Sequence, residues 1–402
     1  MSATARQATR SVFGVRRRRE HTAHFDIALL LSVLGLLCFG FVMVASASMT
    51  IGDTCCKDPF FFVTRNALAL GLALGSGLVT FGVPVTWWER MSPWLFLGGV
   101  GALILVLIPG LGHNVNGATR WIPLGPLNLQ PSEFMKLFAV LYVAGYLVRH
   151  ADAVTTQLAG FIRPMILVGL AAALILKQPD FGTTAVMLAT VMGLLFLGGV
   201  SVLPFAVLFG TVLAGLTVLV LTSEYRMKRI LSFISPFEDP FNSGYQLSQA
   251  LIGFGRGEWL GVGLGNGIQK QYFLPEAHTD FIASVIAEEL GLIGMFAVIA
   301  VFAFISWRAF SIGARAEAVG QRFAAYTAQG IGLWVGLQAF INIGVNAGML
   351  PTKGLTLPFL SYGSNSVIVV CMAMAILLRI DFTLRREETD AKAGRGVPWV
   401  RA

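Results

Sequence analysis

The sequence has few charged residues and few cysteines. Only 12% of its 402 residues are Asp, Glu, Lys or Arg, against roughly 25% in an ordinary soluble domain. This shortage excludes a soluble globular enzyme. The four cysteines show no CxxC or Cys/His spacing that would hold a metal. Cys38 and Cys371 are expected to be core residues, and the adjacent Cys55 and Cys56 to be free thiols or a strained disulfide.

Several catalytic signatures are also missing. The sequence has no GxSxG elbow, no HExxH and no metal-spaced histidine cluster among its five histidines, so serine-hydrolase and zinc chemistry are unsupported. The glycine-rich run over 253–267 matches neither GxGxxG between a strand and a helix nor GxxxxGK[ST]. It could form backbone nests for a pyrophosphate, but loop packing explains it better.

Apolar residues make up 55% of the chain and gather in ten runs. The predicted spans are 27–49, 60–83, 94–111, 131–149, 158–177, 183–200, 203–222, 281–307, 325–347 and 358–380. Runs near 20 residues can cross a hydrocarbon core of about 30 Å. The sequence therefore predicts an all-α polytopic membrane protein of about ten transmembrane helices, whose first run is a retained span.

The excess of positive charge predicts the orientation. The net charge is +8, and 12 of the 29 Lys and Arg lie in 1–26 and 379–402. In a soluble chain this excess would suggest nucleic acid, but beside apolar spans it indicates a cytoplasmic face and no nucleic-acid partner. We expect a basic cytoplasmic tail (1–26), a ten-helix domain (27–380) and a second cytoplasmic tail (381–402).

In this orientation the polar segments 112–130, 223–280 and 348–357 all lie on the extracytoplasmic side. The segment 223–280 is the one long loop, and loops of this length are usually functional or disordered. Its aromatic residues argue against disorder, and the spacing of apolar residues over 244–254 predicts an amphipathic helix along the membrane surface.

Asp280 ends this loop directly before the eighth span. It or Thr279 could simply cap the helix. Alternatively, Asp280 is a general base at the boundary of water and lipid, where an apolar wall and Glu276 would raise its pKa while the helix dipole would lower it. His278 is the one histidine in this candidate site.

Other charged residues lie inside the predicted spans. Glu288 could line the same cavity as Asp280, with Lys136 and Lys353 as candidate partners, and an intramembrane carboxylate is a functional hypothesis by default. Structural bracing is an equal alternative for Glu288 and for Glu289. Lys136 and Glu133, three residues apart in the fourth span, could also neutralise each other.

Two cations are harder to explain structurally. Arg120 and Lys353 each lie in a short loop on the side of Asp280, with no acidic partner nearby in the sequence. Two cations and a carboxylate suit an anionic phosphate ligand beside a proton acceptor.

Several blocks of sequence resemble one known family. They are 41–49, 116–121, 130–133, 178–183, 274–280 with 288–291, and 350–363. Together they resemble the SEDS family of bacterial membrane glycosyltransferases, over nearly the whole chain. The 349–358 stretch and the basic N-terminal tail resemble the cell-division branch rather than the elongation branch.

The resemblance implies a membrane enzyme of the bacterial inner membrane at the division septum. Its expected activity is polymerisation of lipid II, an undecaprenyl-pyrophosphate-linked disaccharide-peptide, into glycan strands. Expected partners are a class B penicillin-binding protein transpeptidase and other divisome membrane proteins. A divalent cation, Mg²⁺ or Mn²⁺, is implied by the substrate and the family, although no ligand set is readable; no organic cofactor is expected.

The resemblance also assigns residues. Asp280 matches the proposed catalytic aspartate, while Arg120, Lys136, Lys353 and Glu276 match positions that shape the same cavity. His278 and Glu288 complete the predicted substrate-binding set.

The sequence departs from the family at 361–366, which reads SYGSNS where SYGGSS is usual. If the second glycine serves to reach a positive φ, Ser364 could strain that turn. Two alternative functions stay open, a lipid II flippase and a structural division scaffold without catalytic activity.

Overall fold

The computed structural model describes residues 25–115, 118–124, 127–200, 202–223, 227, 231–239, 241–242, 244–351 and 354–392. In this part of the chain, eight helices are long and apolar enough to cross a membrane, and two shorter helices are equally apolar. They correspond one to one with the ten predicted spans, so the predicted all-α membrane fold is confirmed.

The elements follow one another along the chain with short connections before residue 223. The apolar helices are α1 (Ile27–Cys56), α2 (Phe61–Gly82), α3 (Val85–Leu107), α4 (Pro131–Arg149), α6 (Leu158–Lys177), α7 (Phe181–Leu197), α8 (Val202–Leu221), α11 (Ile282–Ala318), α12 (Arg322–Asn346) and α13 (Ser364–Lys392). The smaller elements are β1 (His113–Val115), β2 (Ala118–Leu124), β3 (Leu127–Leu129), α5 (Ala151–Thr156), α10 (Tyr245–Gly257) and the π-helical turn η1 (Gln269–Phe273).

Several helices extend past the predicted apolar runs. α3 begins nine residues before the predicted 94, and α11 and α13 continue well past 307 and 380. Hydropathy marks the part of a helix that suits hydrocarbon, whereas backbone hydrogen bonding continues into polar flanks. α1 likewise continues to Cys56, where Cys55 and Cys56 are joined as a disulfide.

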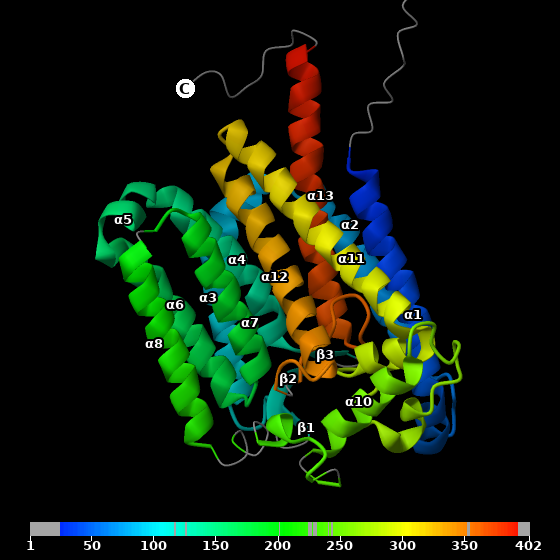
Figure 1. The fold of residues 1–402 in the computed structure, drawn as a ribbon. Coiled ribbons are helices and arrows are strands. Elements are labelled where there is room, and N and C mark those ends of the chain that lie inside the picture. The colour runs from blue at the N-terminus through cyan, green and yellow to red at the C-terminus, as the bar shows by residue number, and fades with distance from the viewer. Residues whose placement is uncertain are drawn as a thin grey trace, which may run out of the picture.

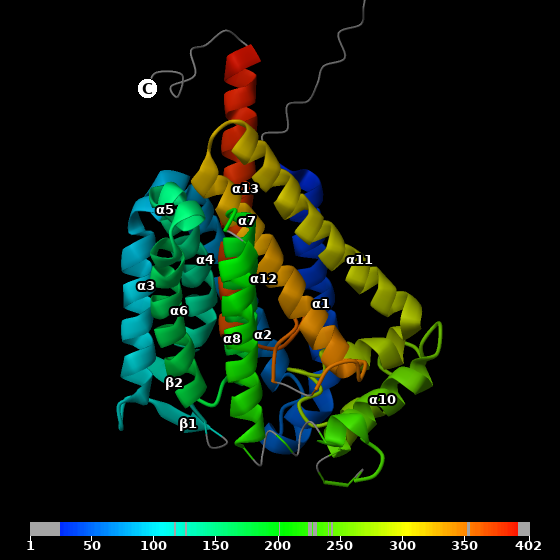
Figure 2. The same ribbon diagram turned by 60° about the vertical axis from the view of Figure 1, so that its left-hand side comes forward.

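Figures 1 and 2 show a bundle of roughly aligned helices with two different ends. The start of α1 and the end of α13 lie at the same end, and β1, β2, β3 and α10 gather at the opposite one, which we call the loop end. α4 is buried along most of its length, while α8 stands at the edge and exposes Leu203 and Val207. The loop end therefore holds the irregular structure that follows the predicted extracytoplasmic segments.

The 112–130 segment forms a small sheet that hydropathy does not predict. Its strand order is β1-β2-β3, and both pairs are antiparallel. His113 pairs with Trp121, and Ile122 pairs with Leu129. This sheet fixes the direction of Arg120, which lies in β2.

The predicted eighth span is interrupted. Gly291, with φ +68°, divides α11. The backbone groups freed by this break bond to 258–263: Val262 N donates to Glu288 O (3.0 Å), and Leu292 N donates to Glu258 O (2.9 Å). A Cβ at Gly291 would lie 2.5 Å from Gly261 N, so the close approach of the loop requires glycine there.

Candidate functional site

A cavity of about 1010 Å³ opens at the loop end. It is lined from segments far apart in the sequence: Arg65, Leu68, Leu72, Ala118, Arg120, Trp121, Asn128, Gln130, Glu133, Asp180, Thr183, Glu276, Thr279, Asp280, Gly354, Leu355, Thr356, Tyr362, Gly363, Ser364, Asn365 and Ser366. Of the predicted site residues, the structure brings Asp280, Glu276 and Arg120 together at this cavity.

Asp280 lies just outside the first turn of α11. The N-cap position belongs to Phe281, so neither Thr279 nor Asp280 caps this helix as one alternative predicted. A Cβ added at Gly354 would lie 2.9 Å from Asp280 Oδ2. The carboxylate is thus placed against a backbone segment that leaves it room only because residue 354 has no side chain.

Glu276 lies beside Asp280 in an unusual backbone conformation, with φ +55°. Its carboxylate Oε2 accepts from Thr279 Oγ1 at 2.6 Å, and its carbonyl accepts from Phe281 N at 3.1 Å. Left-handed backbone at a residue other than glycine is costly and is often found at functional sites. The tight turn it makes presents both carboxylates to the cavity.

Arg120 reaches the cavity from β2 and is anchored to the end of α6. Its Nε donates to Gln178 O (2.9 Å) and its Nη2 to Pro179 O (2.7 Å). Two bonds to carbonyls fix the planar guanidinium without neutralising its charge. The cation is therefore held ready for an anionic ligand.

Lys136 lies behind the cavity wall and does not line it, contrary to the prediction of direct ligand contact. Its side chain is buried, and Nζ bonds to Glu133 Oε1 (3.1 Å) and to Gln338 Oε1 (2.9 Å), 5.3 Å from the centre of the Trp334 ring. The predicted alternative, mutual neutralisation of Glu133 and Lys136, is confirmed. Glu133 is the member of the pair that faces the cavity.

His278 also lies outside the cavity lining. Its ring packs between those of Phe62 and Tyr362, with centroids 5.1 and 5.4 Å away. Burial lowers the pKa of His278, an effect that Glu276 partly opposes. Burial raises the pKa of Tyr362, which does line the cavity and keeps its hydroxyl proton.

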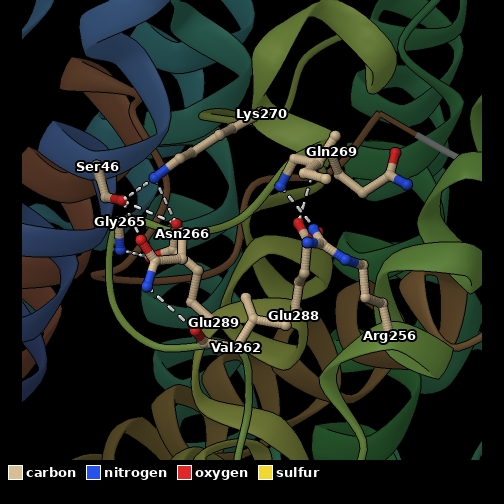
Figure 3. Close-up of polar contacts among 10 residues, drawn as sticks. Ser46, Arg256, Val262, Gly265, Asn266, Gln269, Lys270, Glu288 and Glu289 are labelled. Atoms are coloured by element: carbon tan, nitrogen blue, oxygen red, sulfur yellow. Dashed lines mark hydrogen bonds and ion pairs between the residues drawn. The ribbon is translucent and has the colours of Figure 1, made fainter.

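The expectation that Glu288 lines the cavity and pairs with Lys136 is wrong; the other expected partner, Lys353, lies outside the described residues. Glu288 is fully buried, and its carboxylate accepts from Arg256 Nη1 (2.6 Å), Ile268 N (2.9 Å) and Gln269 N (3.1 Å), as Figure 3 shows in part. The sequence could not indicate this because the long loop folds back against the helix. Glu288 braces the loop, as the structural alternative proposed.

Glu289 makes a second brace beside the first (Figure 3). Its buried carboxylate accepts from Lys270 Nζ (2.5 Å), Ser46 Oγ (3.0 Å) and Gly265 N (3.0 Å). It therefore ties the loop both to α11 and to α1. The sequence did not predict Arg256 and Lys270 as the partners of these two carboxylates. Each lies far from its partner along the chain, 32 and 19 positions away, and the two meet only because the loop folds back.

Two predicted features have no described counterpart. Lys353 lies outside the described residues. Among the residues that the structure describes, no group of three His, Cys, Asp or Glu side chains comes together to hold a metal ion.

Several cavity residues were missed. Arg65 lies on α2 one turn before Leu68, and Leu68 and Leu72 are 65% and 45% exposed. A lone arginine in an apolar run is a signal that could have found Arg65. Asp180 caps α7 through a bond from Thr183 N (3.2 Å) and accepts from Ser132 Oγ (3.3 Å).

The chain is similar to known proteins over nearly all its length. A family described as "Cell cycle protein", whose name joins FtsW, RodA and SpoVE, matches residues 27–386. A protein of Allochromatium vinosum named "Probable peptidoglycan glycosyltransferase FtsW" is 71% identical over 377 residues, 94% of each chain. A protein of the same name from Methylococcus capsulatus is 54% identical over 373 residues, 93% of each chain.

Solved structures have the same fold. One, described as "Structural coordination of polymerization and crosslinking by a peptidoglycan synthase complex", matches with a TM-score of 0.72 and 26% identity over 90% of this chain and 98% of that one. The rod shape determining protein RodA of Thermus thermophilus matches with a TM-score of 0.66 and 26% identity, over 89% of this chain and 96% of that one.

Proposed function

Because the chain belongs to the FtsW, RodA and SpoVE family of cell cycle proteins, we propose that it is a glycosyltransferase that polymerises lipid II into peptidoglycan for the division septum. The observation that supports this most is the convergence of Asp280, Glu276 and Arg120 on one cavity at the loop end of a membrane bundle. A carboxylate and a held cation fit a reaction that moves a proton and releases a diphosphate.

In the proposed reaction Asp280 is the general base. It takes the proton from the 4-hydroxyl of the acceptor sugar as that oxygen attacks the anomeric carbon of the donor. The new glycosidic bond forms as the bond from that carbon to the phosphate oxygen breaks, which inverts the carbon. Undecaprenyl pyrophosphate leaves with the bonding electrons. General-base assistance is typically worth about 10²–10⁴ in rate.

The leaving diphosphate needs positive charge nearby. Arg120 and Arg65 line the cavity and supply it in this proposal. Lys136 acts through Glu133, whose charge it balances, and Lys353 keeps the substrate-binding role that the family resemblance implies. A divalent cation on the diphosphate would add to this stabilisation when bound.

The lipid part of the substrate explains the position of the site. Leu68 and Leu72 line the cavity on an apolar helix and are largely exposed. A polyprenyl chain could leave the cavity over this face and stay in hydrocarbon while the sugars remain at the loop end. The loop end is then extracytoplasmic and both termini are cytoplasmic.

We also propose the expected partner, a class B penicillin-binding protein transpeptidase, and other divisome membrane proteins at the septum. The support for a transpeptidase is the similarity to a chain from a complex described as coordinating polymerization and crosslinking. The chain itself is an integral protein of the inner membrane.

The decisive test is glycan polymerisation by the purified complex supplied with lipid II. Asp280→Asn should abolish strand synthesis while the protein still folds and inserts, since the amide cannot accept the proton. Asp53→Asn, an exposed position on α1 outside the cavity, is the matched control and should keep wild-type activity. Strand synthesis by Asp280→Asn would remove Asp280 from the role of base.

A liposome transport assay run in parallel separates the flippase alternative. Charges within the fourth and eighth spans would suit a path across the membrane, but Glu288 and Glu289 are held by the loop and Lys136 by Glu133. We therefore expect strand synthesis without lipid II transport. A division scaffold would instead tolerate Asp280→Asn as long as partner binding survived.

A further inference from the structure

The C-terminal turns of α12 carry two asparagines that contact the backbone of Asp280. Asn342 and Asn346 are one helical turn apart and share a face. Both are buried, with 2% and 0% of their surface exposed. Neither lines the cavity, so any effect they have on the reaction must pass through other residues.

Asn346 links Asp280 to the first turn of α11. If the helix began earlier, Ser284 N would donate to Asp280 O, four residues before it; in this structure it donates to Phe281 O (3.1 Å). Here the carboxamide of Asn346 lies between them: its Oδ1 accepts from Ser284 N (3.2 Å), and its Nδ2 donates to Asp280 O (3.1 Å). The amide thus gives Ser284 N a second acceptor and Asp280 O a donor, while Asp280 stays outside the helix, at the cavity.

Asn342 connects the same carbonyl to the opposite wall. Its Nδ2 donates to Asp280 O (3.0 Å) and to Leu355 O. Leu355 follows Gly354, whose backbone lies against the Asp280 carboxylate. The Asn342 side chain thus fixes the distance between the backbone of Asp280 and the 354–355 segment that the Asp280 carboxylate contacts.

These bonds are hard to replace. A carbonyl that loses a donor away from bulk water carries a desolvation cost. An apolar residue at position 342 or 346 would leave Asp280 O with one of its two amide donors, so the Asp280 segment would be held less firmly and would shift. A displacement of 1 Å in a catalytic constellation can cost on the order of 10²-fold in rate.

We propose that Asn342 and Asn346 are positioning residues that hold Asp280 in its reactive place, an inference that rests on the proposed function of Asp280. They touch neither substrate nor reacting atoms. They set the backbone from which the base reaches the acceptor hydroxyl.

The test uses Asn342→Leu and Asn346→Leu, which keep the side-chain size and remove the amide. Each should lower kcat about 10- to 100-fold in lipid II polymerisation by the complex, with KM within about twofold because the substrate contacts remain. The acidic limb of the kcat pH profile should also move, since the surroundings of the base change. Loss of folded protein alone would scale the profile without moving that limb.

Thr327→Val is the matched control. Thr327 is a fully buried residue of the same helix whose hydroxyl has no partner among the described residues. This variant should keep kcat, KM and the pH profile. Hydrogen exchange over 281–287 adds a readout independent of activity: both asparagine variants should exchange faster there, Asn346→Leu above all at Ser284, and the control should not.

The outcomes separate the two proposals. If the wild-type complex polymerises lipid II and both leucine variants keep its kcat and its acidic limb, the positioning role is overturned and the proposed function stands. If the wild-type complex makes no strands, the proposed function fails. Exchange alone then decides whether the asparagines hold the Asp280 segment, and unchanged exchange would refute that as well.

Discussion

At the scale of single residues, positive charge reaches the cavity in two ways. Arg120 and Arg65 line it directly, whereas Lys136 is buried one layer behind and balances Glu133. Arginine suits the first position because its fork can bond to carbonyls and still face a phosphate. The buried lysine instead lets an acidic side chain lie at the wall without leaving an unpaired charge.

The buried ring of His278 makes stability depend on pH. Because burial lowers its pKa in the folded protein, the unfolded chain binds the proton more readily. The stability from neutral His278 is complete above its ordinary pKa, about 6.5, and is lost as pH falls from there toward the lowered value. His278→Phe keeps a ring between Phe62 and Tyr362 and should flatten this part of the curve.

The measurement is thermal unfolding of detergent-solubilised protein between about pH 5 and about pH 7.5. The wild type should lose melting temperature below about pH 6.5, and His278→Phe should lose less. Parallel curves for the two proteins across this range would mean that the histidine does not carry the dependence.

The sequence predicted a residue's place in the site where it was enough to know on which side of the membrane its segment lies. Asp280, Glu276 and Arg120 lie in polar segments between spans at one end of the bundle, so the predicted orientation placed them on the same side, although Arg120 belongs to a strand, β2. Glu288, His278 and Lys136 needed knowledge of what packs against them. Spacing along a helix gives the face of a side chain but not its neighbour, and a neighbour can be far away in the sequence, as Gln338 is from Lys136 (202 positions).

At the scale of elements, the break in α11 organises the long loop. Hydropathy predicts one continuous span, because Gly291 is apolar and unremarkable in such a pattern. In the structure the break frees backbone groups that 258–263 then pairs with. Glu288 and Glu289, directly before the break, hold the next part of the loop (Figure 3), which leads on to Glu276 and Asp280.

The Lys270 and Glu289 pair should behave as a buried brace. Lys270→Met leaves the Glu289 carboxylate buried without its cation, and breaking such a pair costs about 3–5 kcal/mol. Changing Glu289→Gln as well removes the stranded charge and should recover most of that loss. Thermal unfolding of the single and double variants measures both effects.

Arg256→Met is the comparison for this cycle. The Arg256 side chain is 36% exposed whereas that of Lys270 is 6% exposed, so the loss should be clearly smaller than for Lys270→Met. Equal losses at the two sites, or no recovery in the double variant, would contradict a brace held by buried charge.

At the scale of the whole molecule, the ten spans followed from the apolar runs, and the basic tails predicted that the start of α1 and the end of α13 lie at the same end. The cavity could not be predicted in this way. Its wall includes Arg65 on α2, Ser366 on α13 and residues of a small sheet that hydropathy cannot detect. The strain expected from Ser364 is also absent: this residue is the first of α13 and does not have a positive φ.

Asn365, the second residue that departs from the family pattern, joins distant parts of the chain. Asn365 Nδ2 donates to Asn128 O at 2.6 Å, so the start of α13 is tied to β3 across the cavity wall. Asn365→Ser, which restores the usual residue, is too short to keep this bond. Because the bond is exposed, its net contribution is about 1 kcal/mol or less, and the fold should tolerate the change.

The expected effect is on access to the cavity. Without the tie, β3 should exchange its amide hydrogens faster over 127–129, and the KM for lipid II should change by a few fold while kcat stays near wild type, since Asp280 is held from α12 and not from α13. Asn66→Ser, at a buried position of α2 outside the cavity lining, controls for a general loosening of the bundle. A fall in kcat with an unchanged KM would show that the wall contributes to the chemical step instead of to entry.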